Sequence, residues 1–280
     1  MDSVTTMEAH EELRAVKNYA NVGSIRELWE YRELLYFLAW RDVKVRYKQT
    51  VLGVLWAIIQ PFFTMIIFTV VFGQIANISS EGVPRPVFYF SALLPWIYFS
   101  STLSAVGMSL TSNSDLLSKI YFPRIILPAA AALVPLVDFL IGSLFLIGFI
   151  IYYDIPMGWN LLLWPTLVVP LALLAFGLGA FLAAINVKYR DVRYAIPFGI
   201  QLLFFMTPII YPSNVVPDHF RWLLTFNPLS ALIEAFRYAL IPSYSVQWHV
   251  LWFSMAVTAV VLALSVVYFT RTEKAFADII

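Results

Sequence analysis

The sequence contains no cysteine and little charge. Without a thiol, the chain forms no disulfide and no cysteine-ligated metal centre, and it has no thiolate nucleophile. Charged residues make up 12% of the 280 positions, which is about half the share found in soluble globular domains. Hydrophobic residues make up 61%. This composition is typical of a protein whose main solvent is lipid rather than water.

Motifs for nucleotide, metal or nucleic-acid chemistry are also absent. No glycine is followed by lysine, which excludes a Walker A loop for ATP, and there is no nucleophile elbow, H-E-x-x-H pair or close carboxylate dyad. The three histidines, His10, His219 and His249, are too far apart in sequence to favour a metal site. The basic residues form no stripe of the kind that binds nucleic acid. We therefore expect no catalytic residue, no metal or cofactor bound by this chain, and no nucleic-acid partner.

Six apolar segments are long enough to cross a bilayer, since a helix of about 20 residues spans the hydrocarbon core. We predict spans at residues 51–75, 87–110, 125–153, 161–185, 194–211 and 248–270. Helices satisfy their own backbone groups in lipid, and the segments lack the alternating polarity of barrel strands. The expected fold class is an all-α integral membrane protein with six transmembrane helices.

The positions of the basic residues predict the orientation of these spans. Of the 18 lysines and arginines, all but Arg85, Arg221 and Arg237 fall in residues 1–50, 111–124, 186–193 and 271–280. The positive-inside rule makes these segments cytoplasmic, so both termini are expected inside the cell. No cleavable signal peptide is evident.

The chain is expected to divide into four parts. A tail at 1–23 shows no usable pattern, and disorder is one interpretation of it. Residues 24–50 form a cytoplasmic amphipathic helix and a basic segment, residues 51–270 the transmembrane domain, and residues 271–280 a cytoplasmic tail.

The helix before the first span is predicted to begin at a capping box, Ser24 to Glu27. Its apolar side would comprise Ile25, Leu28, Leu35 and Leu38, with Arg26, Glu30 and Glu33 facing away. Such a helix either lies in the membrane interface or packs on a soluble partner. The basic run that follows is expected at anionic lipid headgroups, and it comprises Arg41, Lys44, Arg46 and Lys48.

The segment 213–247 is too polar and too rich in proline to form another span. Its apolar pieces, 220–226 and 229–240, have the length of short re-entrant or interfacial helices on the outer face. A full crossing by 229–241 would place the basic C-terminal tail outside the cell, against the charge rule.

The loop 113–124 is unusually apolar for one that faces water. Leu116, Leu117, Ile120 and Tyr121 have the spacing of one side of a short helix, which indicates a docking surface. The turn 186–193 is charged, and its simplest interpretation is a positive-inside anchor.

These loops carry a resemblance to a known family. The segment 113–128, the turn 186–191 followed by 204–212, and Asn227-Pro228-Leu229 followed by 234–237 resemble the permeases of type-2 ABC polysaccharide exporters. That family includes O-antigen, capsule and teichoic-acid transporters. The resemblance extends from Leu34 to the carboxyl terminus.

The resemblance implies a homodimer bound to two copies of a separate ATPase subunit, which would hold ATP and Mg. The complex would move a lipid-linked glycan outward across the bacterial inner (cytoplasmic) membrane. The amino-terminal amphipathic helix would be a second contact with the ATPase. The resemblance also implies that a coupling helix enters a groove on the ATPase, with the residues Asp115, Leu116, Leu117, Lys119, Ile120, Tyr121 and Phe122.

A path for sugars should offer aromatic faces and occasional hydrogen-bonding groups. Two spans carry such a stripe, in which the residues share one helix face. The stripe of the first span comprises Trp56, Gln60, Phe63 and Thr64, and that of the fifth comprises Tyr194, Phe198, Gln201 and Phe205. Contact with lipid or with neighbouring helices is the alternative for the same residues.

Three charged residues lie in or near apolar segments. Asp138 is the only charge inside an apolar span, where a carboxylate needs a partner or a functional reason. Buried structural hydrogen bonding and a gate or proton role are the two interpretations. Glu234 has the spacing to pair with Arg237 or Tyr238 on one helix face, and such a pair could close the outer mouth.

Other classes of transporter and enzyme fit the sequence less well. An ion-coupled secondary transporter should show internal repeats and several intramembrane acids, and a membrane glycosyltransferase or lipid phosphatase should show clustered acids, histidines or basic residues. A type-2 exporter of a drug or another lipid shares the predicted architecture and is the nearest alternative.

Overall fold

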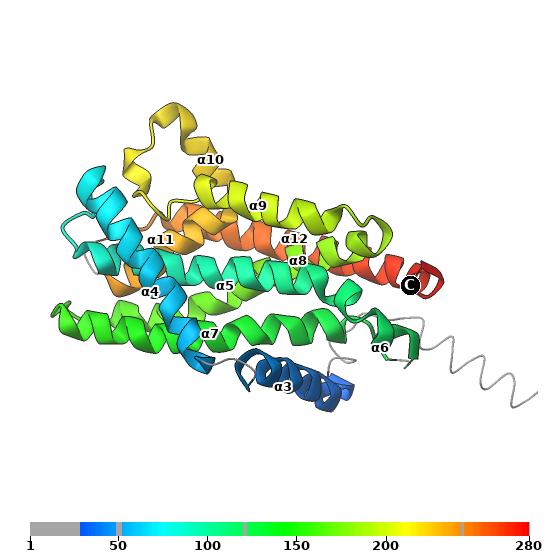
Figure 1. Cartoon of the computed structure of the whole chain (residues 1–280). Helices are drawn as coiled ribbons and strands as arrows, with labels where there is room; N and C mark the ends of the chain where they lie inside the picture. The colour runs from blue at the N-terminus through cyan, green and yellow to red at the C-terminus, as the bar shows by residue number, and fades with distance from the viewer. Residues whose placement is uncertain (1–28, 49–51, 120–121, 242–243, 280) are drawn as a thin grey trace, which may run out of the picture.

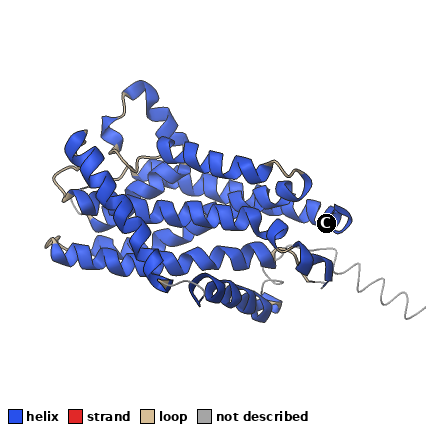
Figure 2. Ribbon diagram, viewed as in Figure 1, coloured by secondary structure: helices blue, strands red, loops and turns tan. Residues whose placement is uncertain are grey.

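The computed structural model describes residues 29–48, 52–119, 122–241 and 244–279, and in these ranges every regular element is helical (Figure 2). The α-helices are α3 (Arg32–Lys48), α4 (Trp56–Phe68), α5 (Arg85–Ser112), α6 (Ser114–Lys119), α7 (Ile126–Tyr152), α8 (Leu163–Lys188), α9 (Val192–Met206), α10 (Arg221–Phe226), α11 (Pro228–Leu240) and α12 (Trp248–Ile279). Shorter helical turns are η1 (Gly53–Leu55), η2 (Thr69–Ile75), η3 (Trp159–Leu162), η4 (Ser213–Val215) and η5 (Asp218–Phe220). The expected all-α class is confirmed.

Five of these helical segments are long and apolar enough to cross a membrane, namely Gly53–Ile75, Arg85–Ser112, Ile126–Tyr152, Trp159–Lys188 and Trp248–Glu273. The other predicted span, 194–211, corresponds to α9, a helix of 15 residues. Helix α9 ends at Met206 because Thr207 precedes a proline, which forces Thr207 into an extended conformation with φ −105° and ψ 137°. A sixth crossing stays a prediction.

Helix α5 lies at the centre of the bundle (Figure 1). It packs against α4, α7, α8, α9 and α11, while α12 packs on the far side of α8. Two glycines of α8 permit this close packing. A Cβ at Gly179 would lie 2.7 Å from the Cβ of Val106 on α5, and a Cβ at Gly177 would lie 3.2 Å from the Cα of Leu262 on α12.

One end of the bundle gathers segments that are far apart in sequence. Near this end, the Arg41 guanidinium of α3 donates to the side-chain oxygen of Asn113, just after α5, at 3.1 Å. The backbone N–H of Arg124, just before α7, donates to the carboxylate of Glu273 on α12 at 2.9 Å. Helices α6 and the end of α12 lie at the right of Figure 1. The described parts of three segments predicted to be cytoplasmic, namely α3, the loop around Asn113 and Arg124, and the end of α12, therefore share one end.

The other end carries α10 and α11 (Figure 1). Both short helices predicted within 213–247 are present, at Arg221–Phe226 and Pro228–Leu240. Asn227 links them to the end of α9. Its side-chain oxygen accepts from the backbone N–H of Leu229 at 3.1 Å, and its amide donates to the Thr207 hydroxyl at 3.0 Å. Whether these helices enter the membrane stays a prediction.

Candidate functional site

The predicted docking loop begins with a short helix, α6, that directly follows α5. Asp115 and Lys119 are exposed on it, whereas Leu116 and Leu117 are half-buried against the apolar cluster at this end of the bundle. Phe122 is 5% exposed and packs inside the same cluster. Of the predicted coupling residues, Ile120 and Tyr121 lie outside the described residues. A rigid partner would thus touch α6 directly and Phe122 only through its neighbours.

Asp138 is held by the end of α3. An oxygen of its carboxylate lies 2.5 Å from the Arg46 guanidinium, and its other oxygen accepts a hydrogen bond from the Tyr47 hydroxyl. Burial and the Asp138 carboxylate both raise the pKa of Tyr47, so the hydroxyl stays protonated and donates. The partners of Asp138 are those of a structural carboxylate. A gate or proton role stays a prediction.

Helix α3 packs alongside the part of α7 nearest α6 (Figure 1). Leu38 is buried and Leu35 half-buried on this side, while Glu33 is exposed, as the amphipathic pattern predicted. The predicted cap and the residues Ile25, Arg26 and Leu28 lie outside the described range. A second apolar surface, on α3 and the turn before it, is exposed and consists of the aromatic rings of Trp29, Tyr36, Phe37 and Trp40. The helix therefore has one face on the bundle and one available to lipid or a partner.

Of the predicted basic run, only Arg46 reaches a carboxylate on another helix. Arg41 pairs with its neighbour Asp42 at 2.8 Å and also bonds to Asn113. Lys44 and Lys48 are exposed, and the Lys44 ammonium lies 5.3 Å from the centre of the Trp40 ring. Contact of these two lysines with lipid headgroups stays a prediction.

The two predicted path-lining stripes lie on the surface of the single chain. Trp56, Gln60 and Phe63 are exposed on α4, and Thr64 is half-buried with its hydroxyl donating to the Gln60 carbonyl. All four residues of the α9 stripe are exposed as well, Tyr194, Phe198, Gln201 and Phe205. The two helices meet where the rings of Phe68 and Phe204 lie 6.0 Å apart. The stripes are thus unpartnered within one copy.

Arg237 is fully buried at the end of the bundle that carries α10 and α11, and it does not form the predicted pair with Glu234. Within the described residues, no ion pair joins the two side chains. The Arg237 guanidinium instead donates to the carbonyl of Ile209 at 2.7 Å and lies 4.0 Å from the centre of the Phe88 ring. Carbonyls are free to accept there because residues 207–212 are not helical.

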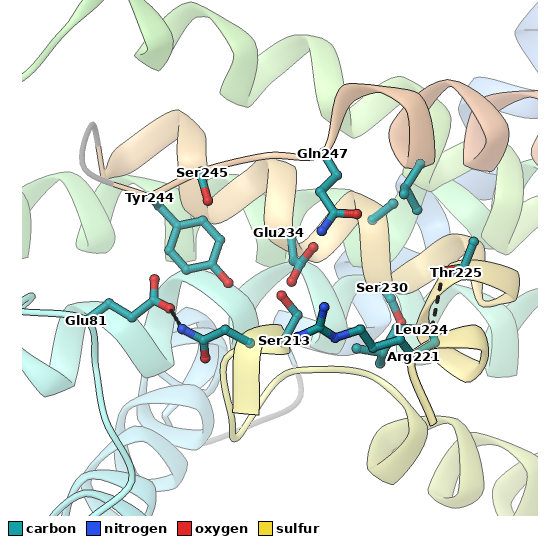
Figure 3. Close-up of a pocket in the computed structure, with 13 residues that line it drawn as sticks. Glu81, Ser213, Arg221, Leu224, Thr225, Ser230, Glu234, Tyr244, Ser245 and Gln247 are labelled. Carbon is teal, nitrogen blue, oxygen red and sulfur yellow. Dashed lines mark hydrogen bonds between the residues drawn. The ribbon is translucent and has the colours of Figure 1, made fainter. Parts of the chain in front are cut away.

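Glu234 faces a polar cavity of about 370 Å³ instead (Figure 3). Burial raises the pKa of its carboxyl above the ordinary 4.5, although the Ser213 hydroxyl and Arg237 oppose the shift. Burial also raises the pKa of Tyr244, on the opposite wall, to about 12, so this phenol is a hydrogen-bond donor at neutral pH. Sequence patterns did not indicate this cavity, because its walls come from segments that are separated in the chain by α5, α7, α8 and α9.

Three residues that tie helices together were not identified from the sequence as functional. They are Tyr47, Asn186 and Asn227. Asn186 is 1% exposed, and its amide donates to the Gly107 carbonyl at 3.2 Å and to the Thr111 hydroxyl at 3.3 Å. Of these three residues, Asn227 alone has a signal in the sequence, because it precedes a proline and Asn-Pro is a common helix start.

The sequence profile of a family described as "ABC-2 type transporter" matches residues 33–241. This range includes α3, the docking loop, both stripes and most of the polar cavity.

Three curated proteins illustrate what the chain is similar to. The O-antigen export system permease protein RfbA of Myxococcus xanthus is 31% identical over 216 residues, which is 76% of this chain and 82% of that protein. The protein of the same name from Klebsiella pneumoniae is 29% identical over 209 residues, 73% of this chain and 79% of its own. The polysialic acid transport protein KpsM of Escherichia coli is 23% identical over 247 residues, 84% of this chain and 92% of its own.

Proposed function

The chain belongs to the ABC-2 type transporter family, and from that premise we propose that it is the membrane permease of an ATP-driven exporter of a polysaccharide. The observation that carries the substrate class is the similarity to O-antigen and polysialic acid permeases over about three quarters or more of the chain. The chain is a multi-pass membrane protein with five long apolar helices. Its cargo is a lipid-linked glycan similar to O-antigen.

Two copies of a separate ATPase subunit supply the energy. The sequence has no Walker A loop, so ATP and Mg bind to that partner rather than to this chain. The exposed position of Asp115 and Lys119 on α6, at the end of the central helix α5, supports α6 as the coupling helix. Closure of the ATPase subunits would push on α6 and shift the permease between two states.

A second copy of the chain completes the path. On α4 and α9, aromatic rings and the amides of Gln60 and Gln201 are exposed, within two segments that are predicted to cross the membrane. Amide groups in hydrocarbon are costly, which favours a partner surface or a water-filled path over lipid. We place the glycan path between the α4 and α9 stripes of a homodimer.

The chain crosses the bacterial inner membrane six times with both termini in the cytoplasm. Helix α9 supports this count because it leads from the end of the bundle that carries Lys188 to the end that carries α10 (Figure 1). With α9 included, the direction of successive spans alternates, and α12 returns to the end where Glu273 meets Arg124. The short helices α10 and α11 then lie on the outer side as re-entrant or interfacial segments.

Deletion of the gene tests the function. We expect loss of the surface polysaccharide and accumulation of its lipid-linked form inside the cell, both restored by the wild-type gene. Changed drug susceptibility with normal surface polysaccharide would instead support a drug exporter of the same architecture.

Coupling is tested on the co-purified complex of the permease and its ATPase. Lys119→Glu on the exposed side of α6, and Leu117→Asp beside it, should reduce the stimulation of ATP hydrolysis by substrate. Met157→Asp, an exposed position in the loop after α7, is the control and should leave the stimulation intact. Unaltered assembly and unaltered stimulation in both α6 variants would refute α6 as the coupling element.

A further inference from the structure

The cavity at the outer end lies between segments for which the sequence predicts no shared role. It is lined by Glu81, from the turn before α5, by α10 and α11, and by the segment that leads into α12 (Figure 3). Its volume of about 370 Å³ is near the lower end of the range for small-molecule sites, roughly 300–1,000 Å³. The cavity therefore has room for one or two sugar rings.

The cavity has an exposed rim and a buried floor. Asn214, Thr225 and Gln247 are exposed at the rim, whereas Ser230 is 2% exposed and Tyr244 5% exposed. Figure 3 shows the Glu234 carboxyl in the middle of the cavity, with Tyr244 and Ser213 near it. The site is thus a pocket with a buried floor rather than a shallow surface.

Two polar atoms that line this pocket have no hydrogen-bond partner among the described residues. They are the Ser230 hydroxyl oxygen and Oε1 of Glu234, and both are fully screened from solvent. Leaving a buried polar group without a partner costs about 1–3 kcal/mol, so native proteins seldom do so without a reason. Because neither atom is open to a water-sized group, a bound hydroxyl group would reach them only after the side chains of the floor shift.

The lining disfavours an anionic ligand and favours a neutral polyol. The Glu81 carboxylate would repel a phosphate or an acidic group, and Glu234 would add to this repulsion when it is ionised. The guanidinium of Arg221 lies within 3.1 Å of Asp218, which balances its charge at the exposed side of the cavity. A metal ion is also disfavoured, since the described residues contain no cluster of three or more acidic, histidine or cysteine ligands.

The remaining groups have the mixture that a sugar ring needs. The lining offers both donors and acceptors, as hydroxyls, amides and carboxyls that can each bind a hydroxyl group. Leu224, Ala231 and Val250 add an apolar wall that the C–H face of a ring can contact. The Glu81 carboxylate is held in place by the Asn214 amide, which donates to it at 2.6 Å.

We propose that this cavity is a carbohydrate-binding site that holds one neutral sugar residue, a hexose or an N-acetylhexosamine, of the glycan as it leaves the transporter. The inference rests on the proposed function, because export is what brings a glycan to this end of the bundle. Binding here would retain the emerging chain between transport steps.

Two variants close the pocket in different ways. Ser230→Leu fills the buried floor, and Thr225→Trp blocks the rim from an exposed position that does not depend on core packing. Thr166→Leu is the control, because Thr166 is an exposed threonine of α8 that does not line the cavity.

The probes are methyl glycosides of glucose, galactose, mannose and N-acetylglucosamine. They are added to the complex of the permease and its ATPase in lipid nanodiscs, and binding is followed by saturation-transfer NMR. We expect at least one glycoside to bind the wild type and the control equally. Its affinity should fall about tenfold or more in both pocket variants, since loss of one hydrogen-bonded contact of about 1.4 kcal/mol is a factor of ten.

Glycan export in cells, measured with the wild-type chain and after its removal, separates the two hypotheses. If the wild type exports the glycan but no glycoside binds, or if binding survives in both pocket variants, the cavity inference is overturned and the proposed function stands. If removal of the chain leaves surface glycan unchanged, the proposed function fails, and the assignment of the pocket to an exported glycan fails with it.

Discussion

The contact between α3 and Asp138 allows a quantitative prediction. The side chain of Arg46 is 46% exposed, so its ion pair with Asp138 contributes about 1 kcal/mol, the upper end for exposed pairs. The hydrogen bond from Tyr47 to a charged acceptor contributes about 1.5–3 kcal/mol. Together the two interactions should stabilise docking of α3 on α7 by about 2.5–4 kcal/mol.

Two substitutions of Asp138 separate these interactions. Asp138→Asn keeps an oxygen that can accept from Tyr47 but loses the ion pair and the charge on that acceptor, so the undocked population should rise about fivefold or more. Asp138→Ala loses both interactions, and the undocked population should rise about 50-fold or more. The order of the two effects follows from the two partners seen in the structure.

The absence of cysteine provides a clean assay. In an Ala39→Cys background, the only thiol lies at a position that is 8% exposed and faces the bundle. When α3 recloses faster than the reagent reacts, the rate of alkylation by N-ethylmaleimide is proportional to the undocked population. Mass spectrometry of the membrane-embedded complex then gives the rate for each variant.

Asp42→Asn is the matched control, because Asp42 pairs with its neighbour Arg41 on α3 itself. Its labelling rate should equal that of the background. Equal rates in the background, in Asp138→Asn and in Asp138→Ala would refute the reasoning that these two contacts hold α3 in place.

Three further predictions concern stability. Gly179→Ala should lower the melting temperature of the purified chain, because the new Cβ would lie 2.7 Å from that of Val106 and overpacking costs about 1–3 kcal/mol. Gly148→Ala adds a Cβ that meets nothing within 4 Å and should leave the melting temperature unchanged. Asn227→Ala removes the cap of α11, which should cost about 1 kcal/mol and speed amide exchange in its first turn. Glu234→Gln should raise the melting temperature relative to the wild type increasingly as the pH rises from 4.5 to 8.

The sign of the last prediction follows from the raised pKa of Glu234. The folded state favours the neutral acid, so the wild type loses stability as the pH rises through the folded-state pKa, and glutamine has no proton to lose. A constant difference in melting temperature across this pH range would contradict the burial of this carboxyl. Equal melting temperatures of the two glycine variants would contradict the close packing at Gly179. Unchanged amide exchange in α11 after Asn227→Ala would contradict the role of Asn227 as its cap.

Much of the fold could be predicted from the sequence because bilayer thickness imposes a length on each span. Five of the six predicted spans match long apolar helices, and both short helices in 213–247 are present. Periodicity also placed Leu38 on the buried side of α3 and the α4 and α9 stripes each on one face. These are local properties, so the sequence alone carries them.

The side-chain partners could not be predicted, because they depend on contacts between distant segments. Asp138 and Tyr47 are 91 positions apart, and the basic run gave no reason to assign Arg46 to a carboxylate rather than to lipid. The spacing of Glu234 and Arg237 favoured a pair on one helix face. Arg237 bonds to Ile209 instead because the turns after α9 present carbonyls that no helix satisfies.

The exposed glutamines of α4 and α9 also bear on how the protein is made. In the proposed homodimer a second copy covers the amides of Gln60 and Gln201, whereas a copy inserted alone would expose them to lipid at an energetic penalty. Such a solitary copy is a natural target for membrane quality-control proteases. Cellular amounts of this chain should therefore follow the supply of its assembly partners, so that surplus copies are removed rather than stored.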